Sequence, residues 1–200
     1  MEILPVKNHL MNGMTYVVYS HDVDYSILID CGEYETLQSE LYRIGKTVKA
    51  VLLTHGHSDH IAGLNELLQR NPSVTVYSNE YGHLEIGNAK KNHSHFAGYP
   101  FEVKNYQKKV ITDGDVLDFE GLCKVKVLWT PGHDESCMSY QIGDCLFTGD
   151  AYIPGLKVFT KFPGAKKEQA IQSEDRLKRL ENEGYQIFCG HHSYDIKYNK

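Results

Sequence analysis

Short apolar runs recur along the chain, and each is bounded by polar residues or glycine. Runs of this kind, rich in valine, isoleucine, leucine and aromatic residues, are typical of β-strands. The polar HDVD between the first two runs and Gly143-Asp144 between two later ones predict hairpins. The expected strands are residues 15–20, 25–30, 48–54, 74–78, 116–119, 123–130, 139–142, 145–148 and 186–189.

Three other stretches carry apolar residues at helical spacing. The first holds Leu37, Leu41 and Ile44 before a glycine, and the others are residues 61–72, ended by a proline, and 170–184, ended by a glycine. Residues 79–108 are polar and predict a helix followed by a long excursion, a candidate lid. Because strands and helices alternate, we expect an α/β fold with sheet packed on sheet and helices outside.

Length and charge narrow the class of protein. The 200 residues fit one domain, which we place at residues 1–200. The net charge of −5 argues against nucleic acid as a partner, since sequence-independent binding needs a basic footprint. We expect neither a secretory leader nor a membrane helix, because no apolar run approaches the ~20 residues that a span requires. The five cysteines form no C-x-x-C pair, which favours reduced thiols in a cytoplasmic protein.

Side chains that bind metals follow four of the expected strands directly. The run VKAVLL leads into THGHSDH, residues 54–60, which holds three histidines and one aspartate. Glycines after the other three runs permit tight turns that expose the next side chain at the strand tip. In α/β sheets, binding sites collect at the carboxyl ends of strands. The expected ligands are His55, His57, Asp59, His60, His133, Asp150 and one of His191 and His192.

These imidazoles and carboxylates suit divalent metals such as zinc, manganese or iron. Seven ligands are too many for one tetrahedral ion, whereas two ions about 3.5–4 Å apart would use all of them. Residues i and i+2 of an extended segment face the same way, so His55 and His57 can hold one ion together. At Asp59 the chain starts to turn into a helix, so Asp59 and His60 point elsewhere and can serve a second ion.

The THGHSDH segment resembles the H-x-H-x-D-H signature of the metallo-β-lactamase superfamily, and the later His133, Asp150 and His191 match its remaining motifs in order and approximate spacing. The resemblance implies an αβ/βα four-layer sandwich. His191 is preferred to His192 as the ligand because members usually show Gly-His there. A histidine rather than glutamate at position 57 separates the chain from the flavodiiron branch. The implied ligand sets are His55, His57 and His133 for one ion, Asp59, His60 and His191 for the other, and Asp150 as the bridge.

Within that superfamily the chain looks most like the glyoxalase II branch, which cleaves hydroxyacyl-glutathione thioesters. The implied function is a dinuclear metal-dependent hydrolase, with zinc favoured over iron or manganese, whose metal-bound hydroxide attacks a thioester or ester/lactone carbonyl. Asp59 would orient the hydroxide, and Tyr152 is a candidate substrate contact. Because the chain ends nine residues after His191, we expect it to lack the branch's C-terminal glutathione-binding domain, which leaves short thioesters and lactones open as small-molecule substrates.

Other functions remain open at this point. A persulfide dioxygenase-like oxidoreductase would use a single iron on the positions of His55, His133 and Asp150, the two-histidine, one-carboxylate pattern of oxygen-activating iron. Such an enzyme would not need the ligands of a second ion. Here Asp59, His60 and His191 are all present, which favours the hydrolase. A nuclease would need an added arm for nucleic acid, and a non-enzymatic metal-binding module would not need both sites. His93 and His95 are interpreted as solvated loop histidines, and the oligomeric state is left open.

Overall fold

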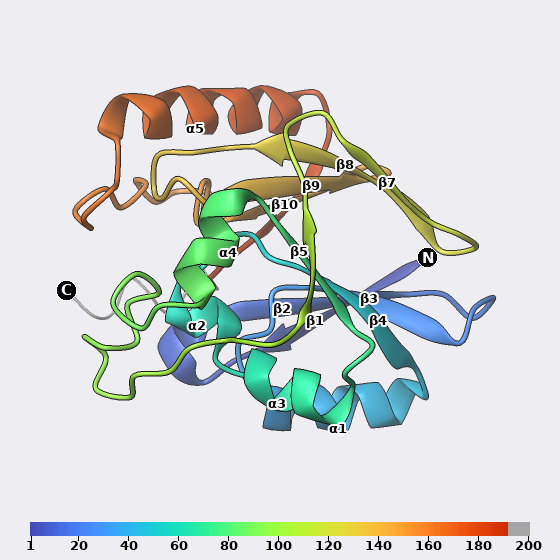
Figure 1. The fold of residues 1–200 in the computed structure, drawn as a ribbon. Coiled ribbons are helices and arrows are strands. Elements are labelled where there is room, and N and C mark those ends of the chain that lie inside the picture. The colour runs from blue at the N-terminus through green and yellow to red at the C-terminus, as the bar shows by residue number, and fades with distance from the viewer. Residues whose placement is uncertain (192–200) are drawn as a thin grey trace.

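The computed structural model describes residues 1–191 and shows two β-sheets packed face to face with helices on both outer faces (Figure 1). Helices α1 (Tyr34–Ile44) and α3 (Leu64–Arg70) cover the first sheet, and α5 (Lys167–Asn182) covers the second. This arrangement confirms the predicted α/β class and the αβ/βα four-layer sandwich. Within residues 1–191, no helix combines the length and apolar character that crossing a membrane would need.

The first sheet has six strands in chain order, from β1 at one edge to β6 at the other. The strands β1, β2 and β3 run antiparallel, which confirms the predicted hairpin, and β3 through β6 run parallel. The strands are β1 (Glu2–Lys7), β2 (Met14–Tyr19), β3 (Tyr25–Ile29), β4 (Thr47–Leu52), β5 (Thr75–Ser78) and β6 (Gln107–Val110).

The second sheet has five strands in the order β11-β10-β9-β8-β7. Neighbours from β7 to β10 are antiparallel, whereas β10 and β11 run parallel. The strands β4, β8, β10 and β11 are the four from whose ends the sequence predicts metal ligands. The bounds are β7 (Val116–Phe119), β8 (Cys123–Trp129), β9 (Met138–Ile142), β10 (Cys145–Gly149) and β11 (Gln186–Cys189).

Alternation of side chains along the strands divides the interior into three apolar layers. In β2, for example, Val17 faces the helices α1 and α3, while Val18 faces the second sheet. The layer between the sheets is centred on Phe147, whose ring lies edge to face with Tyr16 at 5.3 Å and stacks on Phe188 at 5.0 Å. A third, smaller layer lies between the second sheet and α5. The strands β2, β3 and β4 are therefore apolar on both faces.

Two strands, β1 and β6, are missing from the sequence prediction. Both are edge strands of the first sheet, and most of their side chains are not buried. An edge strand needs little apolar surface and tolerates a proline such as Pro5, so neither segment shows a clear period-two pattern. Their sequences, EILPVK and QKKV, illustrate this weakness of signal.

The prediction of a single helix over residues 61–72 is wrong in detail, because the structure has two helices there, α2 (Ser58–Ile61) and α3. Gly63 separates them and packs against the start of α1. A Cβ at this position would lie 2.5 Å from the backbone nitrogen of Tyr34. The close approach of the chain at this position therefore requires glycine.

We expect Phe147→Ala to lower the free energy of unfolding by about 3–5 kcal/mol, because it empties the centre of the layer between the two sheets. The side chain of Phe147 is fully buried, whereas that of Val116 is 61% exposed, which makes Val116→Ala the control. Urea unfolding at a fixed metal load measures both. A loss below about 1 kcal/mol for Phe147→Ala would contradict this account of the core.

Candidate metal centre

The structure brings the seven predicted ligands together at one edge of the sandwich. His55 and His57 follow β4, and Asp59 and His60 lie in α2, whose amino end is next to them. The other three, His133, Asp150 and His191, follow strands of the second sheet. Their donor atoms form three groups within which all atoms lie within 4.8 Å of one another: His55, His57 and His133; His55, His60 and Asp150; Asp59, His60 and His191.

The first group is made of imidazoles only. Nδ1 of His57 lies 3.1 Å from Nε2 of His133, and the ring of His55 lies 4.5 Å from that of His57. All three side chains are buried. Burial lowers the pKa of His55 and of His57 well below the ordinary histidine value, so both rings are neutral at pH 7. Neutral imidazole is the form that binds a divalent metal.

The group of Asp59, His60 and His191, called the second donor group from here on, includes a carboxylate. Oδ2 of Asp59 lies 3.4 Å from Nε2 of His191 and 3.7 Å from Nε2 of His60. The Asp59 side chain is 16% exposed, so solvent reaches this group through its carboxylate. This access could admit a small molecule to the donor atoms.

Asp150 lies between the two groups. Its Oδ1 is 3.5 Å from Nε2 of His60, and its Oδ2 is 3.7 Å from Nε2 of His133 and 3.2 Å from Nε2 of His191. Burial alone would raise the pKa of Asp150, but the nearby His191 and His60 outweigh burial and hold this pKa well below the ordinary value. An ionised carboxylate that reaches both groups has the placement that a bridging ligand requires.

Hydrogen bonds on the far side of the rings fix which nitrogen faces inward. When Nδ1 donates to an oxygen, the neutral ring keeps a lone pair on Nε2. Three rings are held this way, each with Nε2 turned toward the acidic groups: His60 by Oδ2 of Asp30 at 2.8 Å, His133 by the carbonyl oxygen of Phe159 at 2.8 Å and His191 by that of Met11 at 3.0 Å.

Several of the inward atoms are buried and have no hydrogen-bond partner. They are Nε2 of His55, Nε2 of His60 and Oδ1 of Asp150. Buried polar atoms without a partner are costly and rare in folded proteins. A cluster of them on imidazoles and a carboxylate fits divalent cations of borderline softness, such as zinc, iron or manganese. The residues present thus fit the two-metal group that the sequence predicts.

Asp30 is a residue of this centre that the sequence reasoning missed. It directly follows β3 in a left-handed backbone conformation, with φ of +61°, and is 2% exposed. Its carboxylate accepts hydrogen bonds from the backbone nitrogen and the hydroxyl of Thr54, both at 2.7 Å, in addition to Nδ1 of His60. The only sequence signal is an aspartate directly after the apolar run YSILI.

A second omission is the carboxyl pair of Glu85 and Asp134. Glu85 lies in α4 (Glu80–Ile86), the helix that confirms the first part of the prediction for residues 79–108. Burial, the hydrogen bond to Asp134 and the negative charge of Asp134 raise the pKa of Glu85 to about 9. Oδ2 of Asp134 lies 3.9 Å from Nε2 of His57. Gly56 lets Glu85 approach, since a Cβ there would be 2.6 Å from the Glu85 carboxyl oxygen.

Two other predicted residues are placed elsewhere or not described. The Tyr152 side chain is buried in the layer beneath α5, and its hydroxyl donates to Oε2 of Glu181 in α5 at 2.6 Å. That hydroxyl, which we expected to face a substrate, is thus engaged on the helix side, so the expectation is corrected. His192 lies outside the described residues. His93 departs from the solvated-loop interpretation, because it is half-buried and its ring lies 4.5 Å from that of His57.

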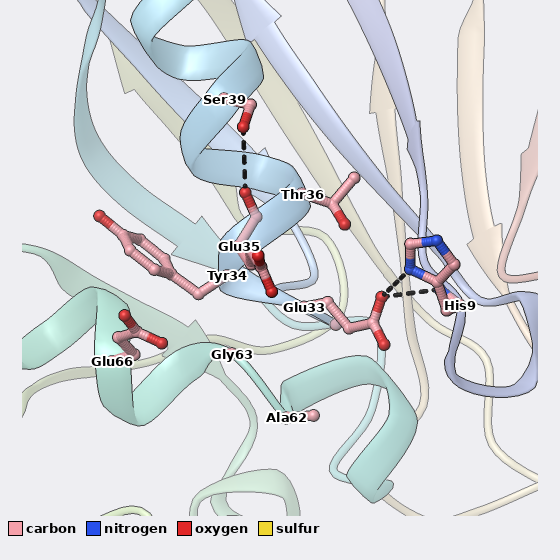
Figure 2. Close-up of a pocket in the computed structure, with 10 residues that line it drawn as sticks. His9, Glu33, Tyr34, Glu35, Thr36, Ser39, Ala62, Gly63 and Glu66 are labelled. Atoms are coloured by element: carbon pink, nitrogen blue, oxygen red, sulfur yellow. Dashed lines mark hydrogen bonds and ion pairs between the residues drawn. The ribbon is translucent and has the colours of Figure 1, made fainter.

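A separate pocket of about 540 Å³ lies at the start of α1 (Figure 2). None of the seven predicted ligands lines it. Figure 2 shows Glu33 facing His9, whose backbone nitrogen and Nδ1 lie 2.7 Å and 3.1 Å from Oε2 of Glu33. The remaining acidic groups, Glu35 and Glu66, line a face open to solvent. We assign no ligand to this pocket.

Comparison with known proteins gives the same family that the motif resembles. The model of the family described as "Metallo-beta-lactamase superfamily" matches residues 10–191. A hydroxyacylglutathione hydrolase of Idiomarina loihiensis is 30% identical over 178 residues, which cover 88% of this chain and 60% of the relative. The chain spans between 48% and 65% of the length of this relative and two other hydroxyacylglutathione hydrolases that it matches.

Solved structures share the fold of this chain. The structure of BLEG-1 B3 metallo-beta-lactamase matches with a TM-score of 0.83 at 23% identity, covering 96% of this chain and 92% of that one. The structure of TTHA1623 in a di-iron-bound form matches with a TM-score of 0.78 at 25% identity, covering 94% and 92%. These likenesses agree with the four-layer architecture described above.

We expect Asp30→Asn to weaken metal binding by about 10–100-fold, because the amide no longer holds Nδ1 of His60 and the Thr54 hydroxyl as a carboxylate does. Asparagine tolerates the left-handed backbone of this position, so the fold should persist. Competition of the protein with a chelator for zinc measures the affinity. Asp118→Asn, whose exposed side chain pairs with Lys124, is the control and should bind as wild type does. Equal affinity in both variants would contradict the role of Asp30.

We expect Glu85→Gln to reduce the loss of stability that occurs as pH rises. The pKa of Glu85 in the folded chain, about 9, exceeds the ordinary value of 4.5, so the folded protein keeps a proton that the unfolded chain releases. The contribution of Glu85 to the free energy of unfolding is therefore fully present below pH 4.5. It falls as pH rises from 4.5 to about 9, by up to about 1.4 kcal/mol per pH unit. Glutamine carries no titratable proton and removes this slope. Urea unfolding at several pH values tests it against Glu80→Gln, an exposed control; identical slopes would refute it.

Proposed function

Because the chain belongs to the metallo-beta-lactamase superfamily, we propose that it is a dinuclear metal-dependent hydrolase that cleaves a thioester or an ester/lactone. The observation that carries this proposal is the placement of Asp150, an ionised, 15% exposed carboxylate within 3.7 Å of histidine nitrogens from both donor groups. A single-ion site would need neither this reach nor the second group of donors.

We propose His55, His57 and His133 as ligands of the first ion and Asp59, His60 and His191 as ligands of the second, with Asp150 between them. The fixed tautomers and the unpaired inward atoms support this assignment. Zinc is the favoured metal because the donors are imidazole and carboxylate, and iron and manganese suit the same set. The di-iron-bound form of TTHA1623, a protein of the same fold, supports iron as the second choice.

When bound, the two ions supply Lewis-acid polarisation of the scissile carbonyl and activation of the attacking water. Asp59 is proposed as the catalytic residue among the side chains. Its carboxylate is partly open to solvent, so it can accept a hydrogen bond from the attacking water and orient it toward the carbonyl. The ring tautomers set by Asp30, Phe159 and Met11 keep the inward nitrogens in place without rearrangement during the reaction.

The hydroxyacylglutathione hydrolases that the chain resembles support a thioester as the substrate. The chain covers 60% of the Idiomarina loihiensis relative, so recognition of a glutathione moiety is a separate question from cleavage of the bond. A short acyl thioester or a lactone presents the same carbonyl to the donor cluster. The partner is thus proposed to be a small molecule, with no nucleic acid, and five free thiols support a cytoplasmic location.

The iron-dependent dioxygenase alternative needs only His55, His133 and Asp150, and it leaves the second donor group unused. The second group, with Asp59, His60 and His191, is complete and lies within 4.8 Å atom to atom. An enzyme with one iron would gain nothing from holding these three side chains in contact. The hydrolase therefore accounts for more of the observed arrangement, and metal stoichiometry separates the two functions.

We expect Asp150→Ala to lose bound metal and to lower thioester and lactone hydrolysis by at least about 1,000-fold, because both donor groups lose their shared carboxylate. Mass spectrometry of untagged protein from metal-balanced growth gives the metals per chain, and a panel of acyl thioesters and lactones gives the activity.

Asp118→Ala, an exposed carboxylate on the second sheet, is the matched control and should keep both the metal and the activity. Two ions per wild-type chain with measurable hydrolysis are the expected result. One iron per chain and no hydrolysis of the panel would overturn the proposed function in favour of oxygen-dependent chemistry.

A further inference from the structure

Four ring side chains form an exposed border beside the first donor group, which we call the aromatic rim: His93, Phe96, Phe159 and Phe162. Two come from the loop between α4 and β6 and two from the loop between β10 and α5. Phe96 is 71% exposed, Phe159 47% and Phe162 37%. None of the four belongs to the three apolar layers of the described chain, so packing of the fold does not explain them.

The rim is continuous with the donor cluster. Phe162 lies 5.2 Å from the ring of His57 and 6.1 Å from that of His133, centroid to centroid. The ring of His93 is 4.4 Å from that of Phe162 and 6.1 Å from that of Phe96. Phe159 extends the series, 4.9 Å from Phe162. An apolar surface therefore starts at the predicted ligands of the first ion and runs outward to solvent.

Backbone contacts hold both loops in place without help from the rings. The Phe159 carbonyl oxygen accepts the hydrogen bond from Nδ1 of His133. In the other loop, buried Asn92 accepts from the backbone nitrogen of Ser58 at 2.7 Å and donates through its side chain to the Phe101 carbonyl oxygen at 2.9 Å. His93 itself has φ of +66°, a backbone region that side chains other than glycine seldom adopt. The rings are thus presented to solvent at fixed positions beside the cluster.

Exposed aromatic rings cost free energy in water and mark binding surfaces when they gather at a site. The three phenylalanine rings, which are the most exposed members of the rim, offer apolar area and no group that pairs with charge. We propose that the aromatic rim binds the apolar acyl group, an aliphatic chain or an aromatic ring, of the thioester or ester that the chain hydrolyses. This inference rests on the proposed function, of which it names the substrate class.

The experiment is a series of N-acetylcysteamine thioesters that share one small neutral leaving group and carry acetyl, butanoyl, hexanoyl or phenylacetyl. A fully buried methylene is worth about fourfold in binding, and the rings stay partly exposed. For the metal-loaded wild-type enzyme we expect kcat/KM for hexanoyl to exceed that for acetyl by about tenfold. In Phe162→Ala and in Phe96→Ala this ratio should fall below about threefold.

The matched control is Tyr42→Ala, an aromatic ring that is 90% exposed on α1 over the outer face of the first sheet. It should leave the hexanoyl-to-acetyl ratio unchanged. A wild-type enzyme that cleaves acetyl and hexanoyl thioesters equally well would overturn the inference and leave the hydrolase standing. A ratio that survives in both Phe variants would also overturn it, since the selectivity would then arise elsewhere.

A second measurement does not depend on hydrolysis. Phenylacetamide, a neutral amide with the same apolar group, is titrated into protein labelled on its phenylalanine rings, and ring shifts are followed by NMR. We expect the resonances of Phe96, Phe159 and Phe162 to move and that of buried Phe147 to stay. Shifts without cleavage of any thioester, ester or lactone would refute the proposed function while retaining apolar binding at the rim. No shifts and no acyl preference would refute the rim as a binding site.

Discussion

The hydrogen bonds of one buried carboxylate, Asp30, organise the rest of the metal centre. Asp30 directly follows β3, yet it holds the segment after β4 through both the backbone nitrogen and the hydroxyl of Thr54, and it holds α2 through His60. The Thr54 hydroxyl in turn lies 3.1 Å from Nδ1 of His55. One histidine from each donor group thus takes its orientation from the same aspartate. An ion this deeply buried is tolerated because three hydrogen bonds replace its lost hydration.

The two sheets are tied together at the edge that carries the centre. The backbone nitrogen of Met138 donates to the carbonyl oxygen of Thr54 at 2.7 Å, and that of Met14 donates to Gly190 at 2.8 Å. The Tyr140 hydroxyl adds a bond to the Leu53 carbonyl oxygen at 2.6 Å. These contacts cross from one sheet to the other beside the ligands, so donors from different sheets are held at fixed separation. Such preorganisation is what a multi-donor site needs from its scaffold.

The sequence predicts those residues of the site that can be recognised from their immediate neighbours in the chain. A histidine or aspartate after an apolar run lies at a strand tip whichever way the sheet is ordered. The pattern therefore predicts six donor positions and one of His191 and His192, and the family resemblance selects His191. Asp30 and Glu85 act through contacts with residues distant in sequence, and nothing in their neighbourhood shows it. Tyr152 shows the converse error: sequence proximity to Asp150 indicated a shared pocket, but the chain turns its side chain under α5.

Each donor group contains residues from both halves of the sandwich, which has a consequence for how the protein folds. Each donor group joins histidines from the first sheet's half with one from the second's: His133 completes the first group and His191 the second. Under the proposed assignment, neither half of the chain contains a whole donor group, and each ion would have its full set of ligands only after both halves have docked in register. Cation binding then selects for correctly joined sheets, and its free energy adds to the stability of the seam between them, in proportion to the logarithm of metal activity.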